Sequence, residues 1–395
     1  MAPLIKVRTC TVGVCFTKGD RKQWLKSLES AAAFNAAATA KFTEAGFEVQ
    51  TTRVATNSFE EWVDNVSDVS GTLAAFREID AELQRLNIGL FNAGPASSAE
   101  AIAIVPDIVA IGPRISTSAS LADPLDASAA KTLAGAILGI SQCTSGGEGN
   151  FQFCCSFNVP PGIPFFPAAY HASGQPTCFG IGCETSAVVA DALPRANGSL
   201  AEAKALLTAS FIKEFTPIEA ISAQLASQHG LVYSGIDASI APLGTAPPLS
   251  EAFASVGLGL FGESGTLAVS SLVTSAVKAL RDRTASGLTI CGYTGLMLPP
   301  CEDAGLARRA TEGGYRIHDL LMYSAVCGLG LDTVPIAGDT PQHKLAALLL
   351  DVAALAFRLD KPLSARLFPV PGKGAGEMTN FAHPILCDCR IFEVP

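Results

Sequence analysis

The sequence predicts a single α/β barrel, and three observations lead to this fold class. Short apolar and β-branched runs alternate with helical patterns along all 395 residues, as in chains whose strands and helices take turns. The strand runs are apolar throughout rather than at every second residue, which is typical of parallel sheets covered on both faces. No long polar linker breaks the alternation, so we expect one domain over residues 1–395. A doubly wound open sheet is the alternative.

The first half of the chain is predicted to contain five strands and three helices. The predicted strands are Val7–Cys15, Phe47–Ala55, Gly89–Asn92, Ile108–Gly112 and Phe151–Phe157. Apolar residues at helical spacing predict the helices Lys22–Ala45, Ser70–Leu86 and Ala119–Leu138. Three X-Pro steps then keep residues 158–171 out of regular structure, because proline breaks both helix and ladder.

The second half continues the alternation to the end of the chain. The predicted strands are Cys178–Cys183, Leu231–Ile236, an irregular strand-loop over Leu288–Leu298, and two closing strands, Ser364–Val370 and Ile385–Val394. The predicted helices start near Glu184 and cover Ser199–His229 (or two helices split at Pro217), Gly265–Leu280, Ile317–Val326 and His343–Leu359. The last two helices flank a predicted loop, Leu331–Thr340.

Composition excludes several classes of partner. The net charge of −9, with no basic run, argues against nucleic acid and against an anionic membrane, because both need clustered Lys and Arg. Only 16% of residues are charged and 49% are apolar, so we expect thick internal layers and a subunit interface, hence a homo-oligomer. The start of the chain lacks a signal-peptide pattern, and no uncharged apolar run reaches the ~18 residues of a membrane span. A cytoplasmic protein is therefore expected.

The 12 cysteines are predicted to be reduced rather than paired in disulfides. Most of them lie within apolar runs, and a chain of this length needs no covalent staples. Cys327 ends a predicted helix, where the negative helix end raises the pKa of a thiol, so packing is a better interpretation than nucleophilic catalysis.

No motif for an organic cofactor is present. The chain lacks a G-x-G-x-x-G turn after its first strand, a G-x-x-x-x-G-K-[ST] loop and a G-x-S-x-G elbow. Dinucleotide redox chemistry, phosphoryl transfer by a P-loop and α/β-hydrolase chemistry are therefore disfavoured. We expect no organic cofactor, while a divalent metal remains possible.

A glycine-rich loop near the C-terminus is the candidate anion site. Gly372, Lys373 and Gly374 lie in a stretch whose glycines permit unusual backbone angles and expose N–H groups. With the lysine among them, these groups suit a carboxylate or phosphate oxygen. The alternative is a surface turn with a solvated lysine.

Acidic residues follow several apolar stretches, where barrel enzymes concentrate their sites. Glu302 and Asp303 come just after Gly295–Leu298, although one of them can cap the next helix. Asp332 follows a Gly-Leu-Gly-Leu stretch with no capping role to explain it. Asp339, like Asp303, is a candidate for substrate binding, and its alternative is a helix cap before Thr340-Pro341.

Two further candidates lie elsewhere in the chain. Asp237 ends the strand Leu231–Ile236 and is a candidate base, metal ligand or substrate anchor. His171 closes the rigid proline-rich loop and is the best general acid or base among the five histidines. A hard-cation site from Asp237, Glu302, Asp303 and Asp332 requires these carboxylates to converge in the fold.

Seven strings occur in order between Val7 and Phe381, and together they resemble the family known as domain of unknown function 711. They are VRTCTVGV, FNAGPA, NVPPGIPFFPAAYH, YSGIDASIAP, GLMLPPCEDAGLA, SAVCGLGLDTVPIAGDT and PLSARLFPVPGKGAGEMTNF. The resemblance implies a single ten-stranded α/β barrel of the type found in pyruvate formate-lyase-like glycyl radical enzymes, with a loop entering the barrel. It does not imply the radical chemistry, since no glycine follows Gly376. The Cys154-Cys155 pair is taken as incidental.

Three functions remain open at this point. The first is an enzyme acting on a small carboxylate-bearing metabolite by acid/base chemistry: a lyase, isomerase, cyclase or hydrolase. In it Lys373 holds the anion, Asp237, Glu302 and Asp332 supply base or metal ligation, and His171 is the acid. The second is a regulatory protein that binds a metabolite without changing it. The third is a Mg²⁺- or Mn²⁺-dependent enzyme using the same carboxylates.

Overall fold

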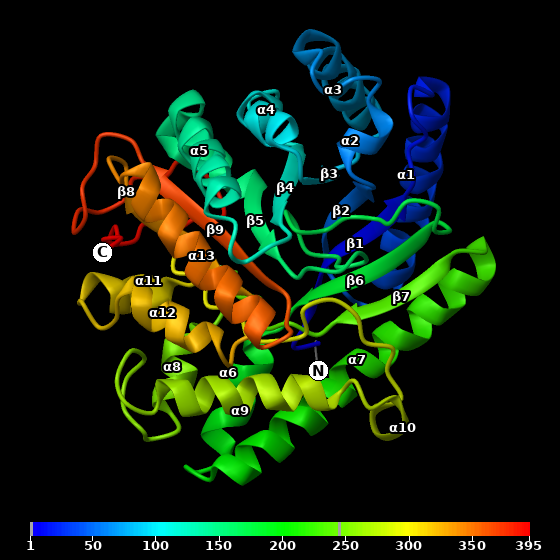
Figure 1. The fold of residues 1–395 in the computed structure, drawn as a ribbon. Helices are drawn as coiled ribbons and strands as arrows, with labels where there is room; N and C mark the ends of the chain where they lie inside the picture. Colours follow the sequence, from blue (N-terminus) through cyan, green and yellow to red (C-terminus); the bar gives the residue numbers. More distant parts are fainter. Residues whose placement is uncertain (1–2, 244–245) are drawn as a thin grey trace.

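A mixed sheet of nine strands forms the centre of the protein in a computed structural model, which describes residues 3–243 and 246–395 (Figure 1). The strand order is β7-β6-β1-β2-β3-β4-β5-β9-β8. The strands are β1 (Lys6–Val14), β2 (Val49–Thr56), β3 (Leu90–Ala96), β4 (Ile115–Leu121), β5 (Phe153–Phe157), β6 (Cys178–Glu184), β7 (Val232–Asp237), β8 (Gly330–Ala337) and β9 (Leu363–Val370).

The sheet consists of two sets of strands that run in opposite directions. Strands β1 to β5 are parallel to one another, as are β6 with β7 and β8 with β9. The pairs β1–β6 and β5–β9 are antiparallel, so β6 to β9 all run against β1 to β5. Mixed α/β architecture is thus confirmed. The regular strands number nine among the described residues, so the predicted count of ten is not reached.

The segment 288–298 links the two edge strands of this sheet. Beside β7, the N–H of Ile236 donates to Thr289 O (2.8 Å) and the N–H of Met297 donates to Ile240 O (3.0 Å). On its other side, the N–H of Gly328, just before β8, donates to Leu296 O (2.8 Å). The segment forms only isolated parallel bridges, one with Ile236 in β7 and one with Ile240 just after it, which agrees with the predicted strand-loop. The sheet therefore curls until its edges are joined.

Helices cover the outer face of the sheet. Figure 1 shows α1 to α5 around the outside of β1 to β5, while α7 lies along β7 and α13 along β9. The helices are α1 (Arg21–Glu44), α2 (Phe59–Trp62), α3 (Val69–Arg85), α4 (Ala99–Val109), α5 (Ala127–Cys143), α6 (Ser186–Arg195), α7 (Leu200–His229), α8 (Leu249–Ala254), α9 (Thr266–Ala279), α10 (Arg283–Ser286), α11 (Ala304–Thr311), α12 (Ile317–Ser324), α13 (Gln342–Arg358) and the 3₁₀ helix η1 (Ser145–Gln152).

Several of these helices begin at a polar cap, as their sequences allow. Asp20, Asp68, Ser98 and Asp126 each accept a hydrogen bond from a backbone N–H in the first turn. Helix α7 continues through Pro217 without a break. None of the helices in the described ranges has both the length and the apolar character needed to cross a membrane.

Three predicted elements were wrong. The apolar run Ile108–Gly112 belongs to the end of α4 and the turn after it, and the next strand begins only at Ile115. Residues Leu331–Thr340 are mostly strand β8 rather than a loop. Residues Ile385–Val394 form isolated bridges rather than a closing strand. Short apolar runs do not distinguish a buried helix end from a buried strand, which explains the first error.

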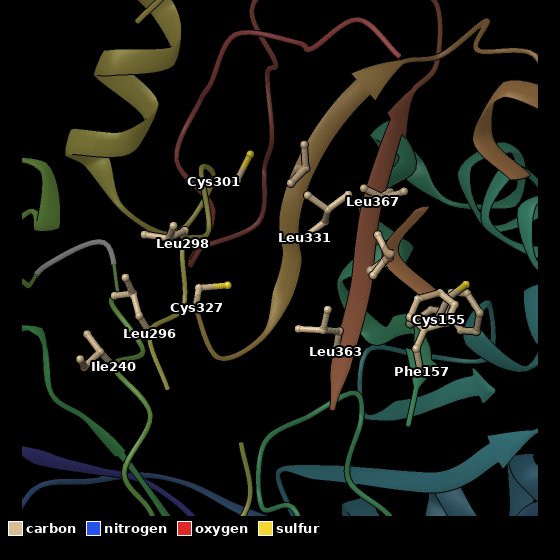
Figure 2. Close-up of a cluster of buried hydrophobic side chains, with 14 of the residues drawn as sticks. Cys155, Phe157, Ile240, Leu296, Leu298, Cys301, Cys327, Leu331, Leu363 and Leu367 are labelled. Carbon is tan, nitrogen blue, oxygen red and sulfur yellow. The ribbon is translucent and has the colours of Figure 1, made fainter. Parts of the chain in front are cut away.

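Neighbouring residues on β5, β8 and β9 face opposite sides of the sheet, since side chains alternate along a strand. Figure 2 shows the outer set, in which Leu331, Leu363, Leu367, Cys155 and Phe157 pack with Leu298, Cys301 and Cys327 in the main hydrophobic core. Cys327 is fully buried in this core, the packing place expected for it. The neighbours of the outer set, Cys154, Asp332, Ser364 and Arg366, face the inner side and line a cavity.

Candidate active site

A cavity of about 700 Å³ lies on the inner side of the curled sheet. Every strand from β1 to β5, together with β8 and β9, contributes to its wall. The proline-rich loop supplies Phe165 to Ala168, and the linking segment with the residues after it supplies Tyr293, Met297 and Glu302. Residues 383–385 of the C-terminal tail complete the lining. Pockets of this size and shape hold small-molecule ligands in proteins.

The cavity lies toward the amino-terminal ends of β1 to β5. Arg8, Leu90, Ser116 and Cys154 all stand among the first three residues of their strands. Glu302 reaches the same place from the opposite direction, because segment 288–298 is parallel to β7 and so antiparallel to β1. Glu302 therefore lies beyond the carboxyl-terminal end of its own segment. On the opposite wall of the cavity it faces the amino-terminal ends of β1 to β5.

Four charged side chains form a continuous chain of ion pairs in the cavity. Arg8 Nη2 lies 2.8 Å from Glu302 Oε2, and Arg366 Nη2 lies 2.5 Å from Glu302 Oε1. Arg366 Nε also lies 2.7 Å from Asp332 Oδ1. The side chains of Glu302, Asp332 and Arg366 are 2%, 6% and 8% exposed, so little water screens these pairs. Arg366 thus bridges two buried carboxylates.

The two carboxylates have pKa values that move in opposite directions. Burial alone would raise the pKa of Glu302, but Arg366 and Arg8 outweigh it and hold that pKa below its usual value. Burial raises the pKa of Asp332, Arg366 counters this only in part, and the neighbouring Glu302 adds to the rise. A pair of acids separated in this way suits a shared acid/base task, with Glu302 ionised and Asp332 the readier proton donor.

The local backbone of β8 positions Asp332. The pairing of β8 with β9 shifts register between Leu331 and Val334, which marks a bulge. Within it Thr333 has φ 45°, a left-handed conformation that is unfavourable for a β-branched residue. Such a conformation costs on the order of 1–3 kcal/mol and tends to occur where function requires it. Leu331 and Val334 both belong to the main core, so the extra residue returns Val334 to the core side after Asp332 has entered the cavity.

Arg53 adds a third guanidinium with no carboxylate partner among the described residues. Its Nε donates to Thr51 Oγ1 (3.0 Å), and its guanidinium carbon lies 5.1 Å from the centre of the Phe166 ring. Its two terminal nitrogens donate to no side chain or backbone atom of residues 3–243 and 246–395. Burial, together with repulsion from Arg8 and Arg366, lowers the pKa of Arg53 to about 9, so it is still a cation at neutral pH. An anion in the cavity would relieve this unfavourable charge.

The tail and η1 meet at the edge of the cavity. His383 is half-buried, and its ring lies 4.4 Å from the Phe151 ring, centre to centre. Burial lowers the pKa of His383, which the nearby Glu148 and Glu302 oppose. Glu148 Oε1 accepts the N–H of Ala382 (2.7 Å), which fixes the tail beside the histidine. His383 is therefore a titratable group facing the cavity.

Of the predicted site residues, Glu302 and Asp332 line the cavity and are bridged by Arg366. Asp237 does not line it. Asp237 is fully buried and accepts hydrogen bonds from the backbone N–H groups of Tyr293 (2.9 Å), Thr294 (2.9 Å) and Ser239 (3.0 Å), and from the Ser239 hydroxyl (2.6 Å). Burial raises its pKa, and these hydrogen bonds oppose the rise. This carboxylate holds the linking segment against the end of β7.

We predict that Asp237→Asn lowers the free energy of unfolding by about 1–3 kcal/mol. The amide nitrogen that replaces one oxygen cannot accept the N–H of Tyr293 or Thr294, which leaves a buried donor without a partner. Urea denaturation measures the change. The matched control is Asp339→Asn, because Asp339 is exposed in the turn after β8. A stability equal to that of the control would contradict the structural role of Asp237.

The remaining predicted residues also lie outside the cavity lining. Asp303 caps α11 and accepts the N–H groups of Gly305, Leu306 and Leu249 (all 2.8 Å). His171 is buried near Cys178, with Nδ1 3.5 Å from its sulfur, and burial lowers the pKa of the imidazole. Asp339 does not cap α13, whose N-cap position is Pro341.

The glycine-rich loop is closed on itself. Lys373 Nζ donates to Met378 O (2.6 Å), and the N–H of Gly374 donates to the carboxylate of Glu377 (2.5 Å). Gly372 is exposed beside them. The Lys373 ammonium and the Gly374 N–H, which were expected to bind an anion, thus have partners within the loop. None of the three residues Gly372, Lys373 and Gly374 lines the cavity.

The three arginines and His383 were not among the site residues predicted from the sequence. Arg8, Arg53 and Arg366 each stand inside a strand whose other residues are largely apolar or small. A cation in the middle of a buried strand requires a partner, which is the signal that identifies such residues. The tail carrying His383 has no comparable signal, because only the fold brings it to the cavity.

The carboxylates do not gather into a cation site. Glu302 and Asp332 accept hydrogen bonds from guanidinium groups, while Asp237 and Asp303 accept hydrogen bonds from backbone N–H groups elsewhere. In residues 3–243 and 246–395 no three His, Cys, Asp or Glu side chains lie close enough together to hold a metal ion. A divalent ion at Glu302 and Asp332 would have to displace Arg366.

The sequence matches the model of one protein family. The family model described as Uncharacterised ACR (DUF711) matches residues 2–382. A UPF0210 protein of Pyrobaculum arsenaticum is 35% identical over 235 residues, which is 57% of this chain and 51% of that protein. A UPF0210 protein of Desulfovibrio desulfuricans is 30% identical over 311 residues, 74% of this chain and 67% of that protein. The chain thus spans between half and two thirds of these relatives.

Among solved structures, the chain is similar to the anaerobic ribonucleotide reductase of Thermotoga maritima. With dATP bound in the specificity site of that enzyme, the TM-score is 0.49 at 10% sequence identity, and the match covers 91% of this chain and 75% of the other. With citrate in its active site, the TM-score is 0.45, and the match covers 91% and 80%.

Proposed function

We propose that this chain, which belongs to the uncharacterised DUF711 family, is an enzyme that acts on a small carboxylate-bearing metabolite by acid/base chemistry. The observation that carries the proposal is the unpaired guanidinium of Arg53 beside two buried acids of divergent pKa. We also propose that segment 288–298 takes the place of the tenth strand of a barrel, because it joins the two edges of the nine-stranded sheet.

In this proposal Arg53 and Arg8 hold the substrate carboxylate. Arg8 uses Nη2 for Glu302 and Nη1 for Pro242 O (3.1 Å), while Arg53 has both terminal nitrogens to offer. A planar guanidinium matches a carboxylate with two parallel hydrogen bonds, and such charge-assisted bonds are strong when water is excluded. These arginines take the place first given to Lys373.

Glu302 and Asp332 supply the proton transfers. Glu302 stays ionised beside two guanidiniums and is the proton acceptor of this proposal, the transferred proton being held by a carboxylate between Arg8 and Arg366. Asp332, whose pKa is raised, is the proton donor on the other side of Arg366. His383 lies at the edge of the cavity and replaces His171 as the candidate histidine. Positioned acid/base groups of this kind contribute about 10²–10⁴-fold to a rate.

The direct test is incubation of a cell extract with the pure protein, followed by untargeted metabolite analysis. A carboxylic acid should be consumed and a product of altered mass or structure should appear, and neither change should occur with heat-inactivated protein. If a metabolite is retained by the protein but recovered chemically unchanged, the regulatory binding protein is the correct function instead. An activity that appears only on adding Mg²⁺ or Mn²⁺ would favour the metal-dependent enzyme.

We predict that Arg53→Gln weakens binding of the metabolite found in this way by about 10- to 100-fold, the range of one or two charge-assisted hydrogen bonds. The free energy of unfolding should stay the same or rise, because the variant removes a buried cation that no carboxylate neutralises. Calorimetric titration and urea denaturation measure the two effects.

The matched control for Arg53 is Arg77→Gln, which removes the same charge from an exposed position on α3. It should change neither property. A large loss of stability in Arg53→Gln without a loss of affinity would contradict a ligand-binding role for Arg53.

A further inference from the structure

We infer that the substrate is an aliphatic or aromatic monocarboxylic acid, with one carboxylate on an apolar body. This inference rests on the proposed function and specifies its substrate class. Dicarboxylates, phosphate esters and nucleotides are the classes it excludes. The charge count of the cavity and the composition of its inner wall carry the inference independently.

The buried charges leave room for one negative group. Three guanidiniums, those of Arg8, Arg53 and Arg366, face two carboxylates, those of Glu302 and Asp332. In the resting site Arg366 lies against both acids and both are ionised, so the excess is one positive charge; Asp332 carries a proton only during the transfer itself. The other acid of the lining, Glu148, is half-buried and fixed to the N–H of Ala382. A second anionic group on the ligand would therefore be buried without a partner, which is costly.

One side of the inner wall is apolar, although hydroxyl groups such as those of Ser116, Tyr293 and Ser364 also line the cavity. A second hydrophobic cluster, separate from the main core, lies on this side of the sheet and includes Phe165, Ala168, Ala241, Met297 and Leu329. All five are buried and all five line the cavity. This side of the wall can therefore contact an apolar ligand body.

The ring of Phe166 is adjacent to both the charged side chains and the apolar cluster. It lies 5.1 Å from the Arg53 guanidinium, and it follows directly after Phe165 of the apolar cluster. A carboxylate bound at Arg53 therefore starts beside an aromatic surface. The cavity of about 700 Å³ is much larger than a two-carbon acid requires. Each methylene added to a monocarboxylate should therefore tighten binding by about three- to fourfold until the wall is covered.

The test is calorimetric titration of the full chain with acids of matched shape. The series butyrate, hexanoate and octanoate varies the apolar body alone. Adipate has the six carbons of hexanoate with a second carboxylate, and 1-hexanol has them with none. We expect Kd to fall about tenfold for each pair of added methylenes, and hexanoate to bind at least tenfold more tightly than either adipate or 1-hexanol. Arg53→Gln should remove the preference for hexanoate over 1-hexanol.

The outcomes separate this inference from the proposed function. If adipate binds as tightly as hexanoate, or if Kd is constant along the series, the apolar-body inference is overturned while an Arg53-dependent anion site stands. If hexanoate and 1-hexanol bind equally in the unaltered protein, the anion site of the proposed function fails as well. If none of the acids binds, the inference fails, and the extract experiment still reports on the enzyme.

Discussion

Replacing Arg366 with methionine should lower the free energy of unfolding by about 3–5 kcal/mol at pH 7, the usual cost of removing one partner from a buried ion pair. Methionine keeps much of the side-chain volume but removes the only cation that contacts Asp332 among the ion pairs of the described residues. It also removes one of the two cations at Glu302. Two carboxylates that are only 2% and 6% exposed then remain without that cation.

This loss should shrink as the pH falls. In the unaltered protein the pKa of Glu302 is lowered, so its contribution to stability is present above the unfolded value near 4.5 and disappears as pH falls through the folded value. Without Arg366 the pKa values of both acids rise, and the folded variant takes up protons before the unfolded chain does. The difference between the two proteins should therefore be largest near pH 7 and smallest near pH 4.

Two further variants test the cause of the Arg366 effect. Arg308→Met breaks an exposed pair with Glu251, whose side chains are 54% and 60% exposed, and should cost no more than about 1 kcal/mol. The double variant Arg366→Met with Asp332→Asn should recover part of the lost stability, because one stranded charge is gone. Urea denaturation at several pH values measures all of them. An Arg366→Met loss as small as that of Arg308→Met would contradict the buried network.

Asp332→Asn should reduce turnover of the metabolite found in the extract experiment by about 10²–10⁴-fold while its affinity changes little. Asparagine can still accept the Arg366 Nε hydrogen bond through its amide oxygen, so the shape of the site is kept. It cannot deliver the proton that the raised pKa of Asp332 makes available. The loss should therefore appear in kcat rather than KM.

The control for Asp332 is Asp351→Asn, an exposed position on α13 that should leave turnover unchanged. The acidic limb of the pH–rate profile should also change in Asp332→Asn, which a merely structural effect would not produce. Unchanged turnover would exclude Asp332 as the proton donor. A rise in KM with unchanged kcat would instead assign it to binding.

The α/β alternation and two acids of the cavity were predicted from the sequence. The ion pairs that connect these two acids through Arg366 were not. Glu302 and Asp332 were identified because each follows an apolar stretch without a sufficient capping role. Asp237 was chosen by the same local logic and Lys373 for the glycines around it, but Asp237 binds backbone N–H groups of the linking segment and Lys373 binds Met378 O of its own loop. Local patterns show which residues need a partner. They do not show whether the partner comes from the same loop or from the opposite wall.

The arginines illustrate what only the strand order decides. Arg366 is on β9, which pairs with β8 on one side and with β5 on the other. That order places its guanidinium between Asp332 and Glu302, which are near neighbours in space but not in sequence. The irregular β8 bulge at Thr333 adds a further departure from simple alternation. Neither feature follows from hydrophobic periodicity, because periodicity fixes the face of a strand and not its neighbours.

The ion pair between Arg8 and Glu302 joins residues 294 positions apart in the chain. At a synthesis rate of about 5–20 residues per second, the first partner waits roughly 15 to 60 s for the second to leave the ribosome. During that time β1 to β5 are present with Arg8 and Arg53 in place, while Glu302, Asp332 and Arg366 are still unmade. In the nascent first half, Arg8 therefore still lacks the carboxylate that it pairs with in the complete protein. Completion of the chain brings Glu302 against Arg8 and buries both side chains almost fully.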